Sequence, residues 1–447
     1  MQEINNSNRR YIYDALYGVI HLPEFIWDVL NSPEVQRLRD IRLCNINSLC
    51  LTGGANINRY EHAIGTFYLA QQCLDTWPLL NPVSKEEKRL FLLASVLHDV
   101  SSAAFGHSVE YIESKAGFDH EKSFEYVVLG EEGKAYQYRF ATFEPVYFGM
   151  QRELPSKISE DDLRAIGQII AGKGRFGPLL NATLDLDNLD NVYRLAYHIG
   201  LVKSGEVPLE VSRSLWTKDG QQIVKEEAVP LIEKWHAIRK KLYLLLLLNP
   251  DEFSAKCMLS EAIELAKDKD VQPINWYDTD YEILSKVSKI SSETATIISR
   301  LVKGDLYGCI GIFSSTKIDR YDTFTSFGRR KALEDELSKL IRTRFKSYHY
   351  AKSIMVALHP IIDVNKTERR VEIRTDKGEN VQIGQSSRKL LIGVFLKNKD
   401  LNIHSLNKLP KELSDGLSTS VLEFLASKLN DSYLLEIKQY AEVHECE

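Results

Sequence analysis

The chain has 447 residues, 44% of them hydrophobic, which is enough for two or three domains or one large domain with additions. Its 57 basic and 62 acidic residues give a formal net charge of −5, so no overall basic excess points to nucleic acid. The six cysteines are scattered without a CxxC pair, and the first residues contain no basic segment that leads into an apolar one. We therefore expect reduced thiols, no secretory signal and a cytoplasmic protein.

The spacing of apolar residues is helical to about residue 350. It predicts helices at 33–44, 59–77, 84–99, 106–115, 119–128, 160–171, 187–200, 227–247, 253–267, 279–286, 291–302 and 330–345. The aromatic-rich stretch 130–155 is irregular, and it indicates either a lid over a cleft or packing between helices. The apolar run 242–248 is too short to cross a bilayer, so we expect a buried helix segment and no membrane span.

After Tyr350 the pattern changes. Short runs rich in branched residues are typical of strands, and Asp376-Lys377-Gly378 is a turn signal between two of them; the runs are 353–358, 370–374, 381–383 and 390–396. A final amphipathic helix is expected at about 420–443. The chain is therefore predicted to be mainly α, with a small α+β region at its C-terminal end.

The dipeptide His98-Asp99 ends a strongly apolar predicted helix. This helix begins at a capping box, Ser84 to Glu87, and continues through an uninterrupted apolar stretch that ends at Leu97. A charged pair at the end of such a buried helix is costly unless it is paired or binds a metal.

His62 and Asp187 flank this dipeptide in predicted helices of their own. Two imidazoles and two carboxylates suit one divalent cation, such as Zn, Mn, Fe or Mg, and leave coordination positions for water and a phosphate oxygen. A cation bound in this way generates hydroxide at neutral pH and polarises a phosphoryl group. The pattern therefore predicts hydrolysis of phosphate esters.

Further segments carry a family resemblance. The elements are Asp14 to Ile20, Ser32 to Arg39, Asn58 to Gly65, Asp185 to Arg194, and Tyr197 to Gly200. With them the chain resembles the HD-domain phosphohydrolases of the deoxynucleoside triphosphate triphosphohydrolase branch. The resemblance covers about residues 9–205 in blocks, and a weaker similarity runs from 235 to 266.

The resemblance implies an organisation and a substrate. It implies an HD-domain helical bundle as the catalytic core at 1–210, a helical extension at 211–345, and an α+β region at 346–447 for oligomer contacts or effector binding. The substrate would be a dNTP, cleaved to deoxynucleoside and triphosphate, and the protein would be a homo-oligomer that binds a nucleotide effector.

The resemblance also implies site residues. His62, His98, Asp99 and Asp187 would be the metal ligands, and Arg59 would contact a phosphate. The basic run Arg239-Lys240-Lys241 either brings positive charge to the substrate or is a solvated helix face. Asp185 and Asp190 either orient the ligand histidines or are solvated acids at a helix start.

Several positions depart from the family pattern. Ser102 stands where the branch has a catalytic histidine, and a hydroxyl does not transfer protons usefully near neutral pH. His107 and His120 titrate in the right range, and Glu110 is a neighbouring acid, so these three are the predicted catalytic residues. Leu43, Asn191 and Leu195 stand at positions that contact the deoxyribose in a relative, which puts strict dNTP selectivity in doubt.

Two rival functions remain open. The first is another HD-domain reaction, catalysed by a nucleotide 5′-phosphatase, a cyclic-nucleotide phosphodiesterase or a nuclease. The second is a nucleotide-binding regulator whose hydrolysis has decayed along with the position of Ser102.

Overall fold

The N-terminal part of the protein is a bundle of helices that follows a two-stranded hairpin. The computed structural model describes residues 10–44, 56–79, 81–106, 120–129, 137–138, 146–147, 149–150, 154, 157–267, 278–398 and 411–437. The first elements are β1 (Arg10–Asp14), β2 (Gly18–Leu22), α1 (Glu24–Leu30), α2 (Pro33–Arg37), α3 (Arg59–Asp75), α4 (Lys85–Leu97), α6 (His120–Leu129), β3 (Gln137–Tyr138), β4 (Val146–Tyr147), α8 (Glu160–Ile170), α9 (Gly177–Leu180), α10 (Leu186–His198) and α11 (Glu206–Ser212).

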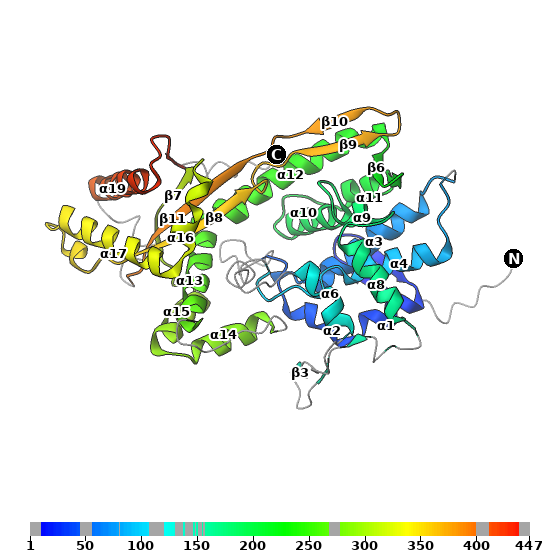
Figure 1. Cartoon of the computed structure of the whole chain (residues 1–447), viewed down its shortest axis with the longest axis horizontal. Helices are drawn as coiled ribbons and strands as arrows, with labels where there is room; N and C mark the ends of the chain where they lie inside the picture. The colour runs from blue at the N-terminus through cyan, green and yellow to red at the C-terminus, as the bar shows by residue number, and fades with distance from the viewer. Residues whose placement is uncertain are drawn as a thin grey trace.

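The second part combines helices with two four-stranded sheets. Its elements are β5 (Leu215–Lys218), β6 (Gln221–Val224), α12 (Val229–Leu248), α13 (Pro250–Lys267), α14 (Asp280–Ser288), α15 (Ser292–Lys303), β7 (Gly308–Ser315), α16 (Tyr321–Thr325), α17 (Phe327–Arg344), β8 (Val356–Val364), β9 (Val371–Thr375), β10 (Asn380–Ile383), β11 (Arg388–Leu396), α19 (Lys411–Leu429) and β12 (Leu435–Glu436). In Figure 1, α12 and the β9–β10 hairpin run along the top, between the N-terminal helices and the C-terminal sheet.

Most of the predicted helices are confirmed, because their start signals act locally. Capping boxes at Ser84, Ser159, Thr279 and Ser291 begin α4, α8, α14 and α15. The helix expected at 33–44 is shorter, since α2 ends at Arg37. The helix expected at 106–115 lies outside the described residues except for its first position, as does most of the stretch 130–155.

One sheet, in the order β12-β7-β11-β8, lies between two layers of helices. Alternate residues of β11 point to opposite faces: Leu391 packs with residues of α13, whereas Ile392 packs with residues of α17 and α19. The sequence did not predict β7. The final helix was predicted to reach residue 443, but α19 ends at Leu429, because Asn430 adopts a left-handed conformation with φ 52°.

The other sheet, in the order β10-β9-β6-β5, joins distant parts of the chain. Strand β9 pairs in parallel with β6, so that Arg374 lies opposite Ile223. Residues of β9 and β10 share one hydrophobic core with the N-terminal helices and with Trp235 of α12. The C-terminal region therefore packs directly against the helical bundle.

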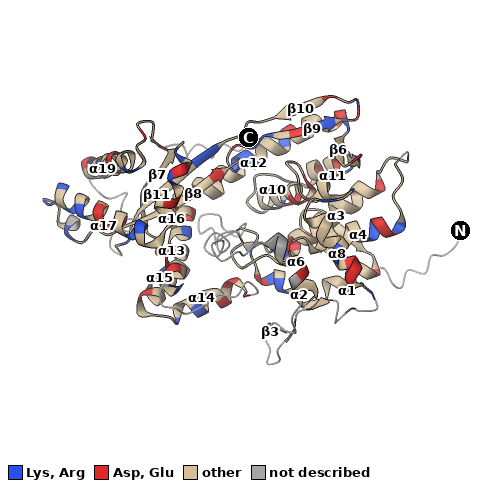
Figure 2. Cartoon of the chain, viewed as in Figure 1, with Lys and Arg blue, Asp and Glu red and all other residues tan. Residues whose placement is uncertain are grey.

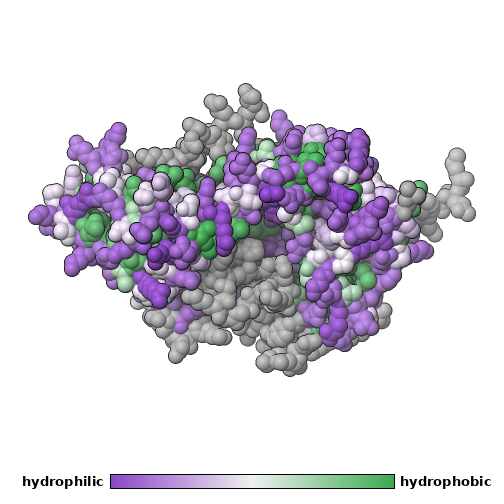
Figure 3. All heavy atoms as spheres, turned by 45° about the horizontal axis from the view of Figure 1, so that its top comes forward, coloured by the Kyte–Doolittle hydropathy of each residue, from purple (hydrophilic) through white to green (hydrophobic). Residues whose placement is uncertain are grey.

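These observations confirm a mainly α fold with a smaller α+β region. Basic and acidic residues are interspersed over both groups of helices (Figure 2), and hydrophilic side chains cover most of the described surface that Figure 3 shows. Among the described residues, no helix combines the length and the apolar character that a bilayer crossing requires.

Candidate metal centre and substrate cavity

His62 lies in the first turn of α3. This helix begins after Asn58, whose side chain accepts a hydrogen bond from the Glu61 backbone N–H at 3.0 Å. The buried imidazole of His62 places Nδ1 2.7 Å from Asp190 Oδ2 and Nε2 2.9 Å from Asp187 Oδ1. Both carboxylates come from α10, so the packing of α3 against α10 orients this histidine.

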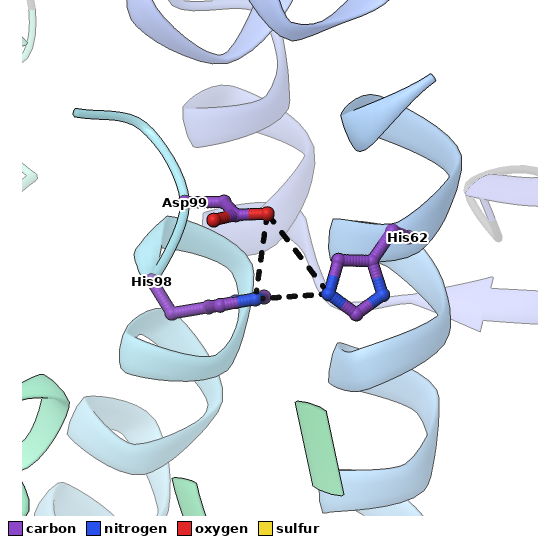
Figure 4. A group of neighbouring side chains, drawn as sticks. All are labelled: His62, His98 and Asp99. Carbon is purple, nitrogen blue, oxygen red and sulfur yellow. Dashed lines mark hydrogen bonds and ion pairs between the residues drawn. The ribbon is translucent and has the colours of Figure 1, made fainter. Parts of the chain in front are cut away.

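His98 and Asp99 follow the last turn of α4 and face His62 (Figure 4). His98 Nδ1 donates a hydrogen bond to the Ser95 carbonyl at 2.8 Å, which leaves its Nε2 as the ligand atom. His98 Nε2 lies 3.2 Å from His62 Nε2 and 3.8 Å from Asp99 Oδ2.

Donor atoms of His62, His98 and Asp99 lie together, and an oxygen of Asp187 lies beside them. Asp99 Oδ2 is 3.9 Å from His62 Nε2, and Asp187 Oδ1 is 3.9 Å from His98 Nε2. Ligand atoms held at about 2.1 Å from one cation lie roughly 3.0–3.4 Å apart. The separations of 2.9 and 3.2 Å lie near this range, and those of 3.8 and 3.9 Å are wider. Since Nδ1 of each histidine is occupied by an acceptor, each Nε2 is the atom available to a cation, which at His62 would replace the proton shared with Asp187. The group of His62, His98 and Asp99 can hold a metal ion, and Asp187 adjoins it.

The electrostatics of these side chains favour a positive charge at the same point. Burial lowers the pKa of His62, but hydrogen bonds to Asp187 and Asp190 outweigh it and raise this pKa to about 10. Burial raises the pKa of Asp99, yet the charges of Arg59, His98 and His62 hold it well below its usual value. The carboxylate of Asp99 is thus ionised, with Arg59 Nη1 donating to Oδ2 at 2.7 Å and Ser102 Oγ donating to Oδ1 at 2.8 Å.

A buried ion network supports His62 from behind. The Arg194 guanidinium donates to Asp190 at 2.9 and 3.0 Å, and also to Asp14 Oδ2 at 2.8 Å. Asp190 and Arg194 are both fully buried. Gly65 of α3 lies against them, since a Cβ at that position would be 2.0 Å from Asp190 Oδ1. Glycine therefore permits the close approach of α3 and α10 on which this network depends.

The donor cluster opens into a cavity of about 530 Å³. Arg59, Ser102 and Arg239 are among its lining residues. Lys240 forms an ion pair with Glu368 at 2.6 Å, and Lys241 is exposed; neither is among the lining residues. Three consecutive positions on a helix point in three directions, so the structure brings only the first of this basic run to the cavity.

The comparisons with known proteins concern the family and the fold. No protein-family model matches the chain. The uncharacterized protein YwfO of Bacillus subtilis is 25% identical over 264 residues, which are 58% of this chain and 57% of that protein. The deoxynucleoside triphosphate triphosphohydrolase SAMHD1 homolog of Dictyostelium discoideum is 21% identical over 44% of this chain. The predicted resemblance to the HD-domain deoxynucleoside triphosphate triphosphohydrolase branch is confirmed.

A solved structure shows the same fold over nearly the whole chain. It is a phosphohydrolase from Bacteroides thetaiotaomicron, with a TM-score of 0.62 and 17% identity, and the match covers 86% of this chain and 99% of that one. The curated relatives match over less of their length: the aligned part spans 57% of YwfO and 38% of the Dictyostelium protein.

The departures from the pattern of this HD-domain branch fall at the cavity. Leu43, Asn191 and Leu195 all line it, as does Ser102. His107 and Glu110 lie outside the described residues. His120 begins α6, but its side chain is not among those described, so the predicted group for proton transfer stays a prediction.

Sequence reasoning missed a second set of basic residues. Lys256 of α13 and three residues of the loop between β8 and β9, Lys366, Arg369 and Arg370, also line the cavity. These residues belong to no motif, and the approach of α13 and this loop to the bundle depends on contacts between distant segments. No signal in the sequence marks them as site residues.

Proposed function

We propose that the protein is a metal-dependent phosphohydrolase that acts on nucleotides, with dNTPs as leading substrates and with deoxynucleoside and triphosphate as products. The observation that carries this proposal is the proximity of two imidazole Nε2 atoms to oxygens of Asp99 and Asp187, beside a cavity large enough for a nucleotide. The resemblance to the triphosphohydrolase branch supports the substrate class.

His62, His98, Asp99 and Asp187 would hold the cation. The chemistry that a divalent cation supplies there is activation of water near neutral pH and polarisation of a phosphoryl group. Arg59, anchored on Asp99 at 2.7 Å, presents positive charge beside the reacting phosphate and stabilises the charge that develops in the transition state.

Proton transfer to the leaving group needs a titratable side chain. Ser102 donates its hydroxyl to Asp99, so it positions that carboxylate and does not serve as an acid or base. We assign proton transfer to His107 or His120, with Glu110 as the neighbouring acid. The alanine variant of the responsible histidine should lose about a hundredfold in turnover while it retains metal. Turnover near wild type in both alanine variants would reject the assignment.

The decisive experiment is a substrate screen with product analysis. Purified protein is incubated with Mn or Mg and each dNTP, NTP, nucleoside monophosphate and cyclic nucleotide, and the released phosphate species are identified. We expect tripolyphosphate from dNTPs. Orthophosphate as the sole product would instead indicate a 5′-phosphatase.

A matched pair of variants tests the metal site within this screen. Asp187→Asn should abolish metal-dependent turnover and reduce the bound metal measured by elemental analysis. Asp161→Asn should change neither, because Asp161 is an exposed carboxylate in the first turn of α8. Full activity of Asp187→Asn would contradict the proposed ligand set.

One observation favours a second candidate, a nucleotide-binding regulator. The position at which the branch has a catalytic histidine is Ser102, and its hydroxyl is engaged with Asp99. Nucleotide binding without turnover of any nucleotide, with any divalent metal, would support this regulator against the hydrolase. Light scattering with and without nucleotide tests the accompanying proposals of a homo-oligomer and a nucleotide effector, which rest on the resemblance alone.

A further inference from the structure

Lys256 brings an unpaired positive charge to the cavity. It lies on α13, is largely buried, and lines the cavity beside Lys366, Cys44 and Glu252. Within the described part of the chain, no carboxylate lies within ion-pair distance of its ammonium group, and no hydrogen bond is formed by it. Glu252, one turn earlier on the same helix, has the largest charge effect that favours its ionised form.

The energetics of Lys256 show that this charge is not compensated within the protein. Burial and, to a smaller extent, the charge of Lys366 lower the pKa of its ammonium group, and Glu252 offsets only part of both effects, so that the pKa is about 7. A buried cation without a partner is costly. An anion that enters the cavity would supply the missing partner and return this lysine to its charged form.

The loop between β8 and β9 is held in place around Lys366. The buried carboxylate of Asp363 accepts hydrogen bonds from the backbone N–H groups of Lys366 at 2.8 Å and Thr367 at 3.2 Å. Arg239 of α12 donates to the Lys366 carbonyl at 2.9 Å and to the Asn365 carbonyl at 3.1 Å. The loop is thus fixed from both sides.

The same loop is anchored next to the metal centre. Arg369 donates to Asn188 Oδ1 at 3.0 Å and to the Ala182 carbonyl at 2.9 Å, and Asn188 directly follows Asp187. On another wall, Cys44 lies within electrostatic reach of both Arg59 and Lys256. Lys256 and Lys366 therefore line the same cavity as the candidate metal ligands. They reach it from α13 and from the β8–β9 loop, whereas the candidate ligands come from α3, α4 and α10.

The charges that line the cavity favour a long anion. Six basic side chains face three acidic ones among the described lining residues, and two of the acids, Asp99 and Asp187, belong to the donor cluster. A single phosphate beside Arg59 would leave the charge of Lys256 without a partner. A chain of phosphates can neutralise both places at once.

We propose that Lys256 of α13 and Lys366 of the β8–β9 loop bind the terminal phosphates of a nucleoside triphosphate, so that the C-terminal region completes the substrate site. This inference rests on the proposed function for its substrate, and it specifies which phosphates are held and by which residues. It gives the β8–β9 loop a role in selecting triphosphates over monophosphates.

The test measures binding of inorganic phosphates, so that its result does not depend on turnover. Isothermal titration of the full chain in EDTA compares tripolyphosphate with orthophosphate. We expect tripolyphosphate to bind at least tenfold more tightly. Lys256→Met and Lys366→Met should each weaken tripolyphosphate binding about tenfold or more, whereas Lys241→Met, at an exposed position of α12 outside the cavity, should leave it unchanged.

Lys256→Met removes an uncompensated buried charge, so its thermal unfolding temperature should equal or exceed that of the wild type. A loss of binding then reports on the site and not on folding. Wild-type affinity in both Met variants, an equal loss in Lys241→Met, or equal affinities for the two anions would overturn the proposal. If no nucleotide is hydrolysed but tripolyphosphate binding falls as expected, the proposed function fails and the anion site stands.

Discussion

The hydrogen bond between Asp190 and His62 gives the sharpest test of how the metal centre is built. In Asp190→Asn the side chain keeps its shape and loses its charge, so His62 becomes a weaker base at Nε2. Removing a partner that orients a ligand histidine typically reduces metal affinity by about 10- to 100-fold, or roughly 1.4–2.8 kcal/mol. We expect a loss in this range because the contact is 2.7 Å long and Asp190 is fully buried.

The same substitution perturbs stability. Removing one partner of a buried ion pair costs about 3–5 kcal/mol, but Asp14 remains bound to Arg194, so we expect about half of this. Titration of Mn at pH 7 gives the metal affinity, and urea unfolding in excess EDTA gives the stability without a contribution from metal binding.

Asp14→Asn is the matched control. Asp14 contacts the same Arg194 at 2.8 Å, but it does not contact His62. This variant should lose stability while it binds Mn with wild-type affinity. Mn affinity within twofold of wild type in Asp190→Asn, or an equal loss of affinity in Asp14→Asn, would refute the view that Asp190 prepares His62 for the cation.

Two further predictions concern stability. Gly65→Ala should destabilise the fold by roughly 1–3 kcal/mol, because the new Cβ would lie 2.0 Å from Asp190 Oδ1. As a control in the same urea unfolding assay, Gly328→Ala in α17, which has open space around it, should stabilise the fold by about 0.5–1 kcal/mol. An unchanged unfolding midpoint for Gly65→Ala would contradict this reasoning. Burial raises the pKa of Glu34 from 4.5 to about 7, so the folded state binds the extra proton and wild-type stability falls as pH rises through this window. Glu34→Gln should therefore be more stable than wild type by roughly 3 kcal/mol at pH 8, with a gain that shrinks toward pH 5; a gain independent of pH would show another cause.

The four residues predicted as metal ligands each follow a local signal in the sequence. His98 and Asp99 end a helix whose start is a capping box, and the structure brings both together with His62 and Asp187. Local signals do not report which distant segments meet. For that reason Lys256 and Lys366, which reach the cavity from α13 and from a loop after β8, were not predicted.

The errors in the fold have the same origin. Strand β7 contains two glycines and lies between helices, and its identity comes from pairing with β11 and β12. The short strands β5 and β6 are likewise completed by β9, which follows more than a hundred residues later. The basic run at Arg239 was read as one patch, but the turn of the helix separates its three side chains.

Arg369 contacts Asn188 and Ala182, which precede it in the chain by 181 and 187 positions. These long-range contacts imply an order of assembly. During synthesis the N-terminal part of a chain emerges and folds first. All four metal donors are therefore made long before the β8–β9 loop, and closing so long a stretch of chain is slow. A nascent protein would acquire its metal centre early and its complete substrate cavity late. The cavity would thus be incomplete until the segment that carries the β8–β9 loop has left the ribosome.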